Sequence, residues 1–301
     1  MKAIDVHAHI STREGVVSLL RYQKGLMEYY LKMELSDDQV LAMAKSEEAM
    51  AQDFINAGVK GILVAWDAEA NTGLPRVSND YIAKVVKDYP EAFIGAYGCV
   101  DPWKGKMAVA EAERAIKELG MMGLKFQQAA QAFYPNDHRF YPLWEKCEEL
   151  RASVQFHTGT TGLGANMKGG GGIHLKYTRP IPYIDDVAAD FPDLKIICCH
   201  PSWPWQDETI AIAIHKPNVF IDLSGWSPKY FPESLKREIK GRLKDRVMFG
   251  SDYPVISHQR LFEDYEREGY APEILERIYY KNAISILGLD IKAPNEGQSQ
   301  G

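Results

Sequence analysis

The sequence predicts a single α/β domain folded as a (β/α)8 TIM barrel, and three observations point to that fold. First, strand-like and helix-like segments alternate eight times along the chain, which is the repeat of such a barrel. Second, several strand-like segments are almost continuously apolar, as parallel strands buried on both faces are. Third, the chain has 301 residues, and such barrels often use about 250 residues as one domain. A doubly wound open sheet is the alternative fold.

The predicted strands are short runs rich in valine, isoleucine and aromatic residues. The first run begins almost at the start of the chain, where Ile4 and Val6 recur with the period of a strand. Later runs are more uniformly apolar, which favours a buried parallel sheet. The eight expected strands are residues 3–8, 59–66, 92–100, 121–126, 153–158, 195–200, 218–223 and 246–251.

Amphipathic helices are expected between the strands. Ser36 and Gln39 form a capping box that starts one helix, and Gly58 ends it. Ser78 caps the next helix, which ends before Pro90. Three further helix faces are formed by Phe140, Leu143, Trp144, Cys147 and Leu150, by Leu235, Ile239 and Leu243, and by Ile274, Leu275 and Ile278.

Two segments fall outside this repeat and are expected to be loop insertions in a domain that spans residues 1–290. Residues 11–35 separate the first strand from its helix, and residues 159–182 follow the fifth strand. A loop of that length in a compact domain is usually a lid or a binding loop, or else is disordered. The run Gly169–Gly172 has too much backbone freedom to form a rigid cradle. The last residues, 291–301, are expected to be a disordered tail.

Composition and charge narrow the classes of partner. Acidic and basic residues are mixed throughout and the formal net charge is −6, which argues against nucleic acid or an anionic membrane. No run approaches roughly 18 apolar residues, so we expect no membrane span, and a strand stands where a signal peptide would lie. The four cysteines contain no C-x-x-C pair, so we expect reduced thiols in a cytoplasmic protein. The sequence leaves open whether the protein forms a homo-oligomer.

The first ten residues, MKAIDVHAHI, place His7 and His9 on one face of the first strand. Residues two apart on a strand point to the same side, with Cα atoms roughly 6–7 Å apart. Two imidazoles at that spacing can bind one metal ion through nitrogen atoms at about 2.0–2.1 Å. Taken alone, the pair could equally be two half-exposed histidines at the end of a strand.

Further residue types that bind metals fall at the ends of other predicted strands. His157 ends the fifth strand in VQFHTG, His200 ends the sixth in IICCHP, and Asp252 ends the eighth in MFGSDYP. In (β/α)8 barrels the active site lies at these carboxyl ends of the strands. Each residue alone is often structural, as a core histidine or a helix N-cap aspartate. Together with the histidine pair of the first strand, they predict a site for a divalent metal.

The motifs DVHAHI, HTG, CHP and GSDYP resemble those of the amidohydrolase superfamily. More narrowly, they resemble the branch that contains aminocarboxymuconate-semialdehyde decarboxylase and γ-resorcylate decarboxylase, and the resemblance runs to KNAISILGL near the C-terminus. It implies a single divalent metal held by four residues and two acid/base groups, His200 and Asp252. Zn²⁺ suits such ligands, and Mn²⁺ and Fe²⁺ also fit. The four implied ligands are His7, His9, His157 and Asp252.

Lys125, which ends the fourth strand in GLKFQQ, leaves a second arrangement open. Some members of the superfamily carry a carboxylated lysine at that strand end, where it bridges two metals. His157 and His200 would then hold the second metal. Otherwise Lys125 binds a substrate carboxylate or packs with its amine at the mouth of the barrel.

Aromatic and cationic residues near the same strand ends are candidates for substrate binding. Trp66 ends the second strand, and Trp203 and Trp205 follow the sixth strand in HPSWPW. Aromatic rings beside a metal could stack on a planar substrate, or they could only fill the rim of the barrel. We name Arg179, in the second insertion, as a partner for a substrate carboxylate, although nothing in the sequence selects it over the other cations of the insertions.

The predicted site offers a Lewis acid, a water whose pKa a metal lowers toward about 7, and two acid/base groups. These parts serve either non-oxidative decarboxylation of a small, planar carboxylate or hydrolysis of a small lactone, amide or ester. The resemblance implies decarboxylation, while hydrolysis is the usual reaction of the superfamily. A barrel with a structural metal and a lactonase without metal are the remaining alternatives. No G-x-S-x-G, P-loop or H-E-x-x-H motif occurs, so the sequence does not support a serine hydrolase, a phosphate-binding NTPase or a zincin.

Overall fold

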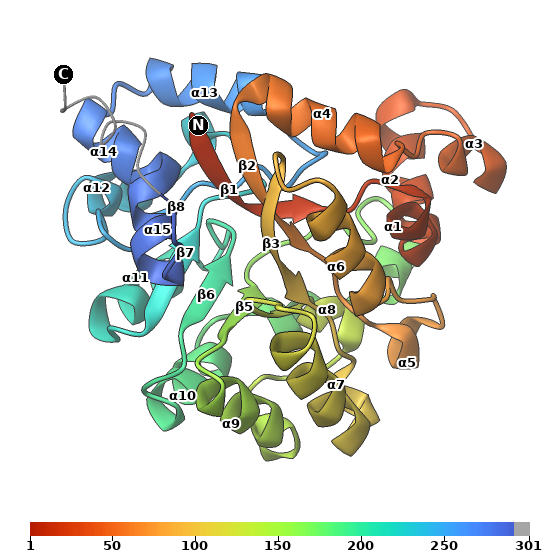
Figure 1. Cartoon of the computed structure of the whole chain (residues 1–301), viewed down its shortest axis with the longest axis horizontal. Coiled ribbons are helices and arrows are strands. Elements are labelled where there is room, and N and C mark those ends of the chain that lie inside the picture. The colour runs from red at the N-terminus through yellow and green to blue at the C-terminus, as the bar shows by residue number, and fades with distance from the viewer. Residues whose placement is uncertain (292–301) are drawn as a thin grey trace.

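The computed structural model describes residues 1–291, which form the predicted (β/α)8 barrel (Figure 1). Its eight strands are hydrogen-bonded in chain order, and the paired neighbours are parallel. The predicted tail, residues 291–301, lies outside the described residues apart from Ile291. The strands are β1 (Ala3–His9), β2 (Val59–Val64), β3 (Phe93–Gly98), β4 (Gly123–Phe126), β5 (Ser153–His157), β6 (Ile196–Cys199), β7 (Val219–Asp222) and β8 (Val247–Met248).

The barrel closes between β1 and the segment that follows β8. β8 has two residues, but the chain continues alongside β1 beyond it. The amide of His9 donates to the carbonyl of Tyr253 at 3.0 Å, and the amide of Asp252 donates to the carbonyl of His7 at 3.0 Å. These bonds hold the beginning and the end of the sheet side by side. They also bring the first and last predicted metal ligands together.

Helices cover the outside of the barrel between successive strands (Figure 1). Within residues 1–291, none of them is both long and apolar enough to cross a membrane. Ser78 starts α6 as predicted, because its side chain accepts a hydrogen bond from the amide of Tyr81 at 3.1 Å. The helices are α1 (Arg13–Ser18), α2 (Leu20–Leu31), α3 (Asp37–Leu41), α4 (Glu47–Ala57), α5 (Glu69–Thr72), α6 (Asn79–Asp88), α7 (Lys106–Lys117), α8 (Gln128–Gln131), α9 (Tyr141–Glu149), α10 (Tyr183–Asp190), α11 (Gln206–His215), α12 (Glu233–Ile239), α13 (His258–Arg267), α14 (Pro272–Glu276) and α15 (Asn282–Leu287).

The core lies between the strands and this outer layer of helices. Phe126 of β4 and Phe156 of β5 meet Trp144 of α9 edge-to-face, with ring centroids 5.0 and 5.1 Å apart. All three side chains are fully buried. Burying a large apolar side chain of this kind stabilises the fold by about 1.5–3 kcal/mol. The apolar strand segments of the sequence therefore build the sheet and also anchor the helices around it.

The predicted helix between Ser36 and Gly58 is in fact two helices, α3 and α4. The capping box at Ser36 starts α3, and Gly58 ends α4 with a φ of +66°. Between them the amide of Lys45 donates to the carbonyl of Ser11 at 2.9 Å, so the backbone there pairs with the residues that follow β1. Such pairing requires extended backbone and interrupts the helix. Ser46 then caps the N-terminus of α4, where the second helix begins.

Two other predicted helix faces extend past the helices that carry them. α12 ends before Gly241, and Leu243 is buried in the turn beyond it. Glycine is a poor helix former, which explains the early end. Ile278 lies in a π-helical turn, Arg277–Lys281, that joins α14 to α15.

The first insertion, residues 11–35, is mostly helical rather than a loop, because α1 and α2 occupy most of it. These helices have an apolar face to bury, which explains why the segment folds. Their apolar side chains contribute to a second cluster that is separate from the main core. Its buried members are Val16, Leu35 and Val40, with Leu20, Met27, Leu41 and Ala44 packed against them.

The second insertion, residues 159–182, folds into two short 3-10 segments. The first is η3 (Lys168–Gly172) and the second is η4 (Leu175–Thr178). Three successive glycines of η3, Gly169–Gly171, have φ between 59° and 64°, a conformation that residues with a Cβ seldom adopt. The glycine run therefore allows three successive residues to adopt left-handed backbone conformation.

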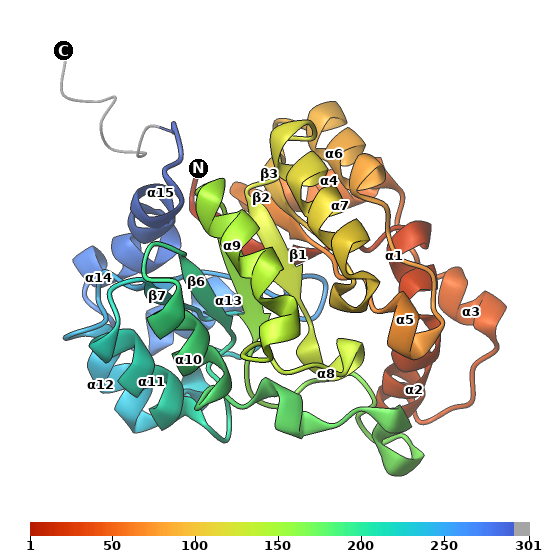
Figure 2. The same ribbon diagram turned by 90° about the horizontal axis from the view of Figure 1, so that it is seen from below.

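The two insertions contact each other. Arg21 Nη2 of α2 donates to the carbonyl of Gly171 at 2.8 Å. A Cβ on Gly25 would lie 2.7 Å from Met167 Cγ, so the two segments pack without space between them there. Figure 2 shows the segment after β5, in green, running below α8 toward α2. Closure of this segment over a ligand stays a prediction.

Candidate metal centre

His7, His9 and Asp252 converge where β1 meets the segment after β8. His9 Nε2 lies 2.9 Å from Asp252 Oδ1, and His7 Nε2 lies 3.5 Å from the same oxygen. One ligand atom from each residue lies within 4.8 Å of the others. The His7 side chain is 1% exposed, but those of His9 and Asp252 are 19% and 18% exposed. The group is therefore closed on one side and open on the other, as catalytic metal sites are.

Local backbone geometry builds this group from β1 and from the turn after β8. His7 and His9 are two residues apart on β1, and their ring centroids are 5.0 Å apart. Asp252 has a φ of +58°, in the left-handed region that aspartate tolerates better than most residues. Its amide donates to the His7 carbonyl, which ties the turn to β1. The predicted pairing of these three residues is therefore a consequence of barrel closure.

The donor set fits a divalent metal. His7 Nε2 is buried and has no hydrogen-bond partner among the described residues. Leaving such an atom unsatisfied costs about 1–3 kcal/mol, so an external partner is expected there. Burial and the charge of Lys125 hold the pKa of His7 well below its usual value, although Asp252 opposes them. His7 is therefore a neutral imidazole, and two imidazoles with a carboxylate suit Zn²⁺, Mn²⁺ or Fe²⁺.

The other two predicted histidines lie beside this group. The His200 ring is 4.9 Å from that of His7 and 4.7 Å from that of His157. His157 is not part of the three-residue group and stays a proposed fourth ligand. Its Nε2 lies 3.0 Å from the carbonyl oxygen of Thr160, which can only accept, so Nδ1 is the nitrogen that would be available to a metal. Burial lowers the pKa of His200 to about 4, despite the opposing charge of Asp252. His200 is therefore a neutral base at pH 7.

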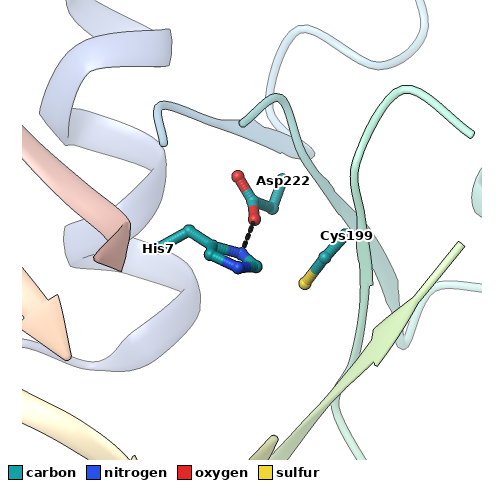
Figure 3. A group of neighbouring side chains, drawn as sticks. All are labelled: His7, Cys199 and Asp222. Atoms are coloured by element: carbon teal, nitrogen blue, oxygen red, sulfur yellow. Dashed lines mark hydrogen bonds and ion pairs between the residues drawn. The ribbon is translucent and has the colours of Figure 1, made fainter. Parts of the chain in front are cut away.

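The sequence analysis missed Asp222, which ends β7 directly behind His7 (Figure 3). His7 Nδ1 lies 2.6 Å from Asp222 Oδ2, and Asp222 is fully buried. Cys199 lies next to both, but burial raises the pKa of its thiol well above the usual value, so it is a poor metal ligand. In this second group, Asp222 therefore holds the His7 ring by a hydrogen bond to Nδ1, the nitrogen that does not face Asp252. The signal in the sequence was a carboxylate at the end of the apolar strand NVFIDL.

Lys125 lies inside the barrel, within the same cluster. Its side chain is fully buried, and no nitrogen or oxygen of the described residues accepts a hydrogen bond from its Nζ. The thiol of Cys199, a weak acceptor, lies beside the ammonium. After burial and His200, its charge is the next cause that holds the pKa of His157 well below the usual value. The amine is thus close to the candidate metal centre and forms no ion pair with a described carboxylate, although the buried Asp222 lies within its electrostatic reach.

The predicted tryptophans differ in their distance from the centre. The Trp66 ring lies 5.0 Å from that of His9, nearly perpendicular to it, so Trp66 forms one wall of the centre. Trp203 is 53% exposed, and Trp205 is half-buried at the start of α11. Only Trp66 among the three has a ring contact with a predicted metal ligand in the described part of the chain.

Arg179 is held by another partner. Its Nη2 lies 2.7 Å from Glu208 Oε1, and its Nε also donates to the Glu208 carboxylate, at 3.0 Å. The pair is half-exposed and tethers the second insertion to α11. Arg179 would have to leave Glu208 to bind a substrate carboxylate, so its proposed role stays untested.

Residues 4–289 match the amidohydrolase family. The chain belongs to that family. Two curated decarboxylases resemble it. The 2-amino-3-carboxymuconate-6-semialdehyde decarboxylase of Dictyostelium discoideum is 33% identical over 84 residues, which are 28% of this chain and 23% of that protein. The decarboxylase orsB of Emericella nidulans is 24% identical over 264 residues, which are 72% of this chain and 77% of that protein.

Solved structures share the fold of this amidohydrolase. An uncharacterized TIM-barrel protein from Bordetella bronchiseptica has a TM-score of 0.76 and 25% identity, covering 96% of this chain and 100% of its own. The 5-carboxyvanillate decarboxylase of Sphingomonas paucimobilis has a TM-score of 0.68 and 19% identity, covering 96% and 99%. A dihydroxybenzoic acid decarboxylase from a Polaromonas species, with bound manganese and the inhibitor 2-nitroresorcinol, has a TM-score of 0.65 and 17% identity, covering 96% and 98%.

Proposed function

We propose that this amidohydrolase is a metal-dependent enzyme that removes a carboxyl group as CO₂, without oxidation, from a small planar carboxylate. The observation that carries the proposal is the buried ammonium of Lys125, which has no hydrogen-bonded anion among the described residues and lies beside a centre suited to a metal. The two curated relatives are both named decarboxylases, which supports the same reaction. Hydrolysis of a lactone, amide or ester is the alternative.

Lys125 separates these reactions because its buried Nζ has no hydrogen-bonded anion among the described residues. An unpaired charge in the interior of a protein costs several kcal/mol, even after local relaxation. A bound carboxylate would supply a charged hydrogen-bond partner, whereas a neutral lactone or amide would supply only a neutral one. Lys125 lies on β4, within electrostatic reach of His7, His157 and His200. It can therefore orient a substrate carboxylate toward these residues.

The metal would be held by His7, His9 and Asp252, with His157 as the proposed fourth ligand, and would supply a Lewis acid for substrate oxygens. The donor set suits Zn²⁺, and manganese in a structural neighbour favours testing Mn²⁺ as well. Trp66, perpendicular to His9, gives a planar substrate ring an aromatic wall.

His200 is the residue placed to move a proton. It is neutral at pH 7, so its ring can accept a proton from a substrate hydroxyl or from water. The proton is passed to the carbon that carries the carboxylate. The bond from that carbon to the carboxylate then breaks, its electron pair returns to the substrate, and CO₂ leaves. Each turnover consumes one proton.

The compartment is proposed to be the cytoplasm. All four cysteines, Cys99, Cys147, Cys198 and Cys199, are free and buried. Burial raises the pKa of Cys147 and Cys198 to about 12, which makes these thiols unreactive. Unpaired, inert cysteines suit a reducing compartment.

The test is a screen of hydroxybenzoates, muconate semialdehydes and lactones against protein loaded with Zn²⁺ or Mn²⁺, followed by CO₂ release and by hydrolysis. We expect CO₂ release from a carboxylate, and its loss on treatment with a chelator. Hydrolysis of lactones without CO₂ release from any carboxylate would contradict the proposal and favour the alternative.

A variant of Lys125 sharpens this screen. Lys125→Met removes the charge, and losing one partner of a buried charge pair costs about 2 kcal/mol or more, so kcat/KM should fall at least roughly 30-fold. The same variant should melt at an equal or higher temperature, because it no longer buries an ammonium without a hydrogen-bond partner. Lys244→Met, at an exposed lysine, is the control. Full activity of Lys125→Met would remove the main support for a carboxylate substrate.

A further inference from the structure

A chain of hydrogen bonds runs behind the metal centre and joins two of its histidines. His7 Nδ1 lies 2.6 Å from Asp222 Oδ2, as Figure 3 shows, and Ser224 Oγ lies 2.7 Å from the same oxygen. His200 Nδ1 lies 2.7 Å from Ser224 Oγ and 3.0 Å from the Ser224 carbonyl oxygen. Asp222 and Ser224 are fully buried, so bulk water does not compete for these bonds. A proposed metal ligand and the proposed acid/base residue are thus connected.

The direction of each bond follows from groups that can only donate or only accept. The carbonyl of Ser224 can only accept, so His200 Nδ1 carries the proton of that contact. The Ser224 hydroxyl donates to Asp222 Oδ2, which leaves its lone pairs for the same His200 N–H. His200 Nε2 is then the nitrogen without a proton, and it is the atom free to act as a base.

His7 is held in the same way by Asp222. The carboxylate accepts from His7 Nδ1–H, so His7 Nε2 carries no proton. That Nε2 has no hydrogen-bond partner among the described residues, and it lies 3.5 Å from Asp252 Oδ1. Asp222 also accepts from the Ser224 amide at 2.9 Å, so it receives three hydrogen bonds, which favour its charged form, although burial raises its pKa above the usual value.

We propose that Asp222 and Ser224 are positioning residues that hold His7 and His200 in the Nδ1-protonated form, so that both present a bare Nε2 to the reaction site. Asp222 places a buried negative charge behind His7, which makes that imidazole a stronger ligand. Ser224 links the same charge to His200, where positive charge develops when the ring takes up a proton. The effect on turnover rests on the proposed function, but the effect on metal binding does not.

The first test measures the binding of Mn²⁺ to the metal-free protein by competition with a chelator. In Asp222→Asn an amide replaces one carboxylate oxygen and cannot accept all three bonds, so Mn²⁺ should bind roughly 10- to 100-fold more weakly. The control is Asp264→Asn, because Asp264 of α13 is also buried and accepts from a serine, Ser227 Oγ, at 2.7 Å. Equal Mn²⁺ affinity of the two variants would overturn the role of Asp222.

The second test measures the unmodified sequence, so its result does not depend on the folding of an Asp222 or Ser224 variant. Protein labelled with ¹⁵N-histidine reports by NMR which ring nitrogen carries the proton. We expect His7 and His200 to be protonated at Nδ1 in the metal-free protein at neutral pH. The signals of His7 and His200 are identified by comparison with His7→Ala and His200→Ala. Protonation of either ring at Nε2 would contradict the proposal.

The third test separates Ser224 from Asp222. Ser224→Ala keeps the carbonyl contact to His200 but loses the link to Asp222, so kcat should fall while KM and Mn²⁺ affinity change little. Ser227→Ala is the control, since it removes a hydroxyl that also donates to a buried aspartate. Equal kcat of the two serine variants would leave Ser224 without a positioning role. If no substrate is decarboxylated, the Mn²⁺ and NMR tests still decide the role of Asp222.

Discussion

Gly250, directly after β8, offers a steric test of the support behind the metal centre. A Cβ at this position would lie 2.4 Å from Asp222 Oδ1, 2.7 Å from Ser224 Cβ and 3.2 Å from His7 Cβ. Real Cβ atoms essentially never come closer than 3.0 Å to another heavy atom. Gly250→Ala therefore forces the Asp222 carboxylate away from the position in which it accepts its hydrogen bond from His7.

The size of the effect follows from this overlap. Inserting a methyl group into a well-packed site costs about 1–3 kcal/mol of the free energy of unfolding. For a chain of this length we expect the melting temperature to fall by about 2–5 °C. Disturbing the partner of a ligating histidine should also weaken Mn²⁺ binding roughly 10- to 100-fold. The loss of metal affinity is the more specific outcome, because the overlap is centred on Asp222 and His7.

Calorimetry gives the melting temperature, and chelator competition gives the Mn²⁺ affinity. Gly241→Ala is the matched control, since its added Cβ would meet its nearest atom, a backbone oxygen, at an ordinary 3.5 Å. The control should retain both values. If Gly250→Ala bound Mn²⁺ as tightly as Gly241→Ala, the carboxylate of Asp222 would not govern the His7 ligand, and the argument from hydrogen bonding would fail.

The remaining predictions concern the metal ligands, the base and the second insertion. Replacing His7 and His9 together by alanine should remove bound metal and activity with the fold retained; a full metal complement by elemental analysis would contradict the centre. His200→Ala should keep its metal but lose at least ~10²-fold in rate; metal loss in parallel would favour the two-metal arrangement. Proteolysis within residues 159–182 should slow when a substrate analogue is bound, because this insertion is predicted to close over the ligand. An unchanged cleavage rate would contradict a lid role for the insertion. Shortening Gly169–Gly172 should lower kcat/KM but not metal content. Full activity of this variant would mean that residues outside the insertion bind the substrate.

Local sequence patterns were enough to predict the barrel and the three residues that meet in its candidate metal centre. Residues two apart on a strand share a face, so His7 and His9 had to lie together on β1. The carboxyl ends of parallel strands meet at one end of a barrel, so Asp252 after β8 was expected near them. The family membership read from these motifs is confirmed by the match over residues 4–289. These features depend on periodicity and chain order, which a sequence displays directly.

Helix boundaries were less predictable because they depend on distant backbone partners. The division between α3 and α4 follows from the pairing of Lys45 with Ser11, and no local signal announces that pairing. The first insertion was expected to be a loop, yet it folds as helices because they have an apolar cluster to bury. Such partners exist only once the chain has folded around them.

The sequence by itself determined which residue types stand at the strand ends, and so the chemistry that the centre offers. Only the tertiary structure decided how they are paired. Asp222 bonds to His7 across 215 positions of sequence, and Arg179 is paired with Glu208 rather than facing the centre freely. The buried Nζ of Lys125 is left without a hydrogen-bond partner among the described residues. The physical reason lies in what each level specifies. The two-residue period of a strand and the order of the strands along the chain place a side chain on a given strand and face. Barrel closure and packing then decide which other side chain it contacts.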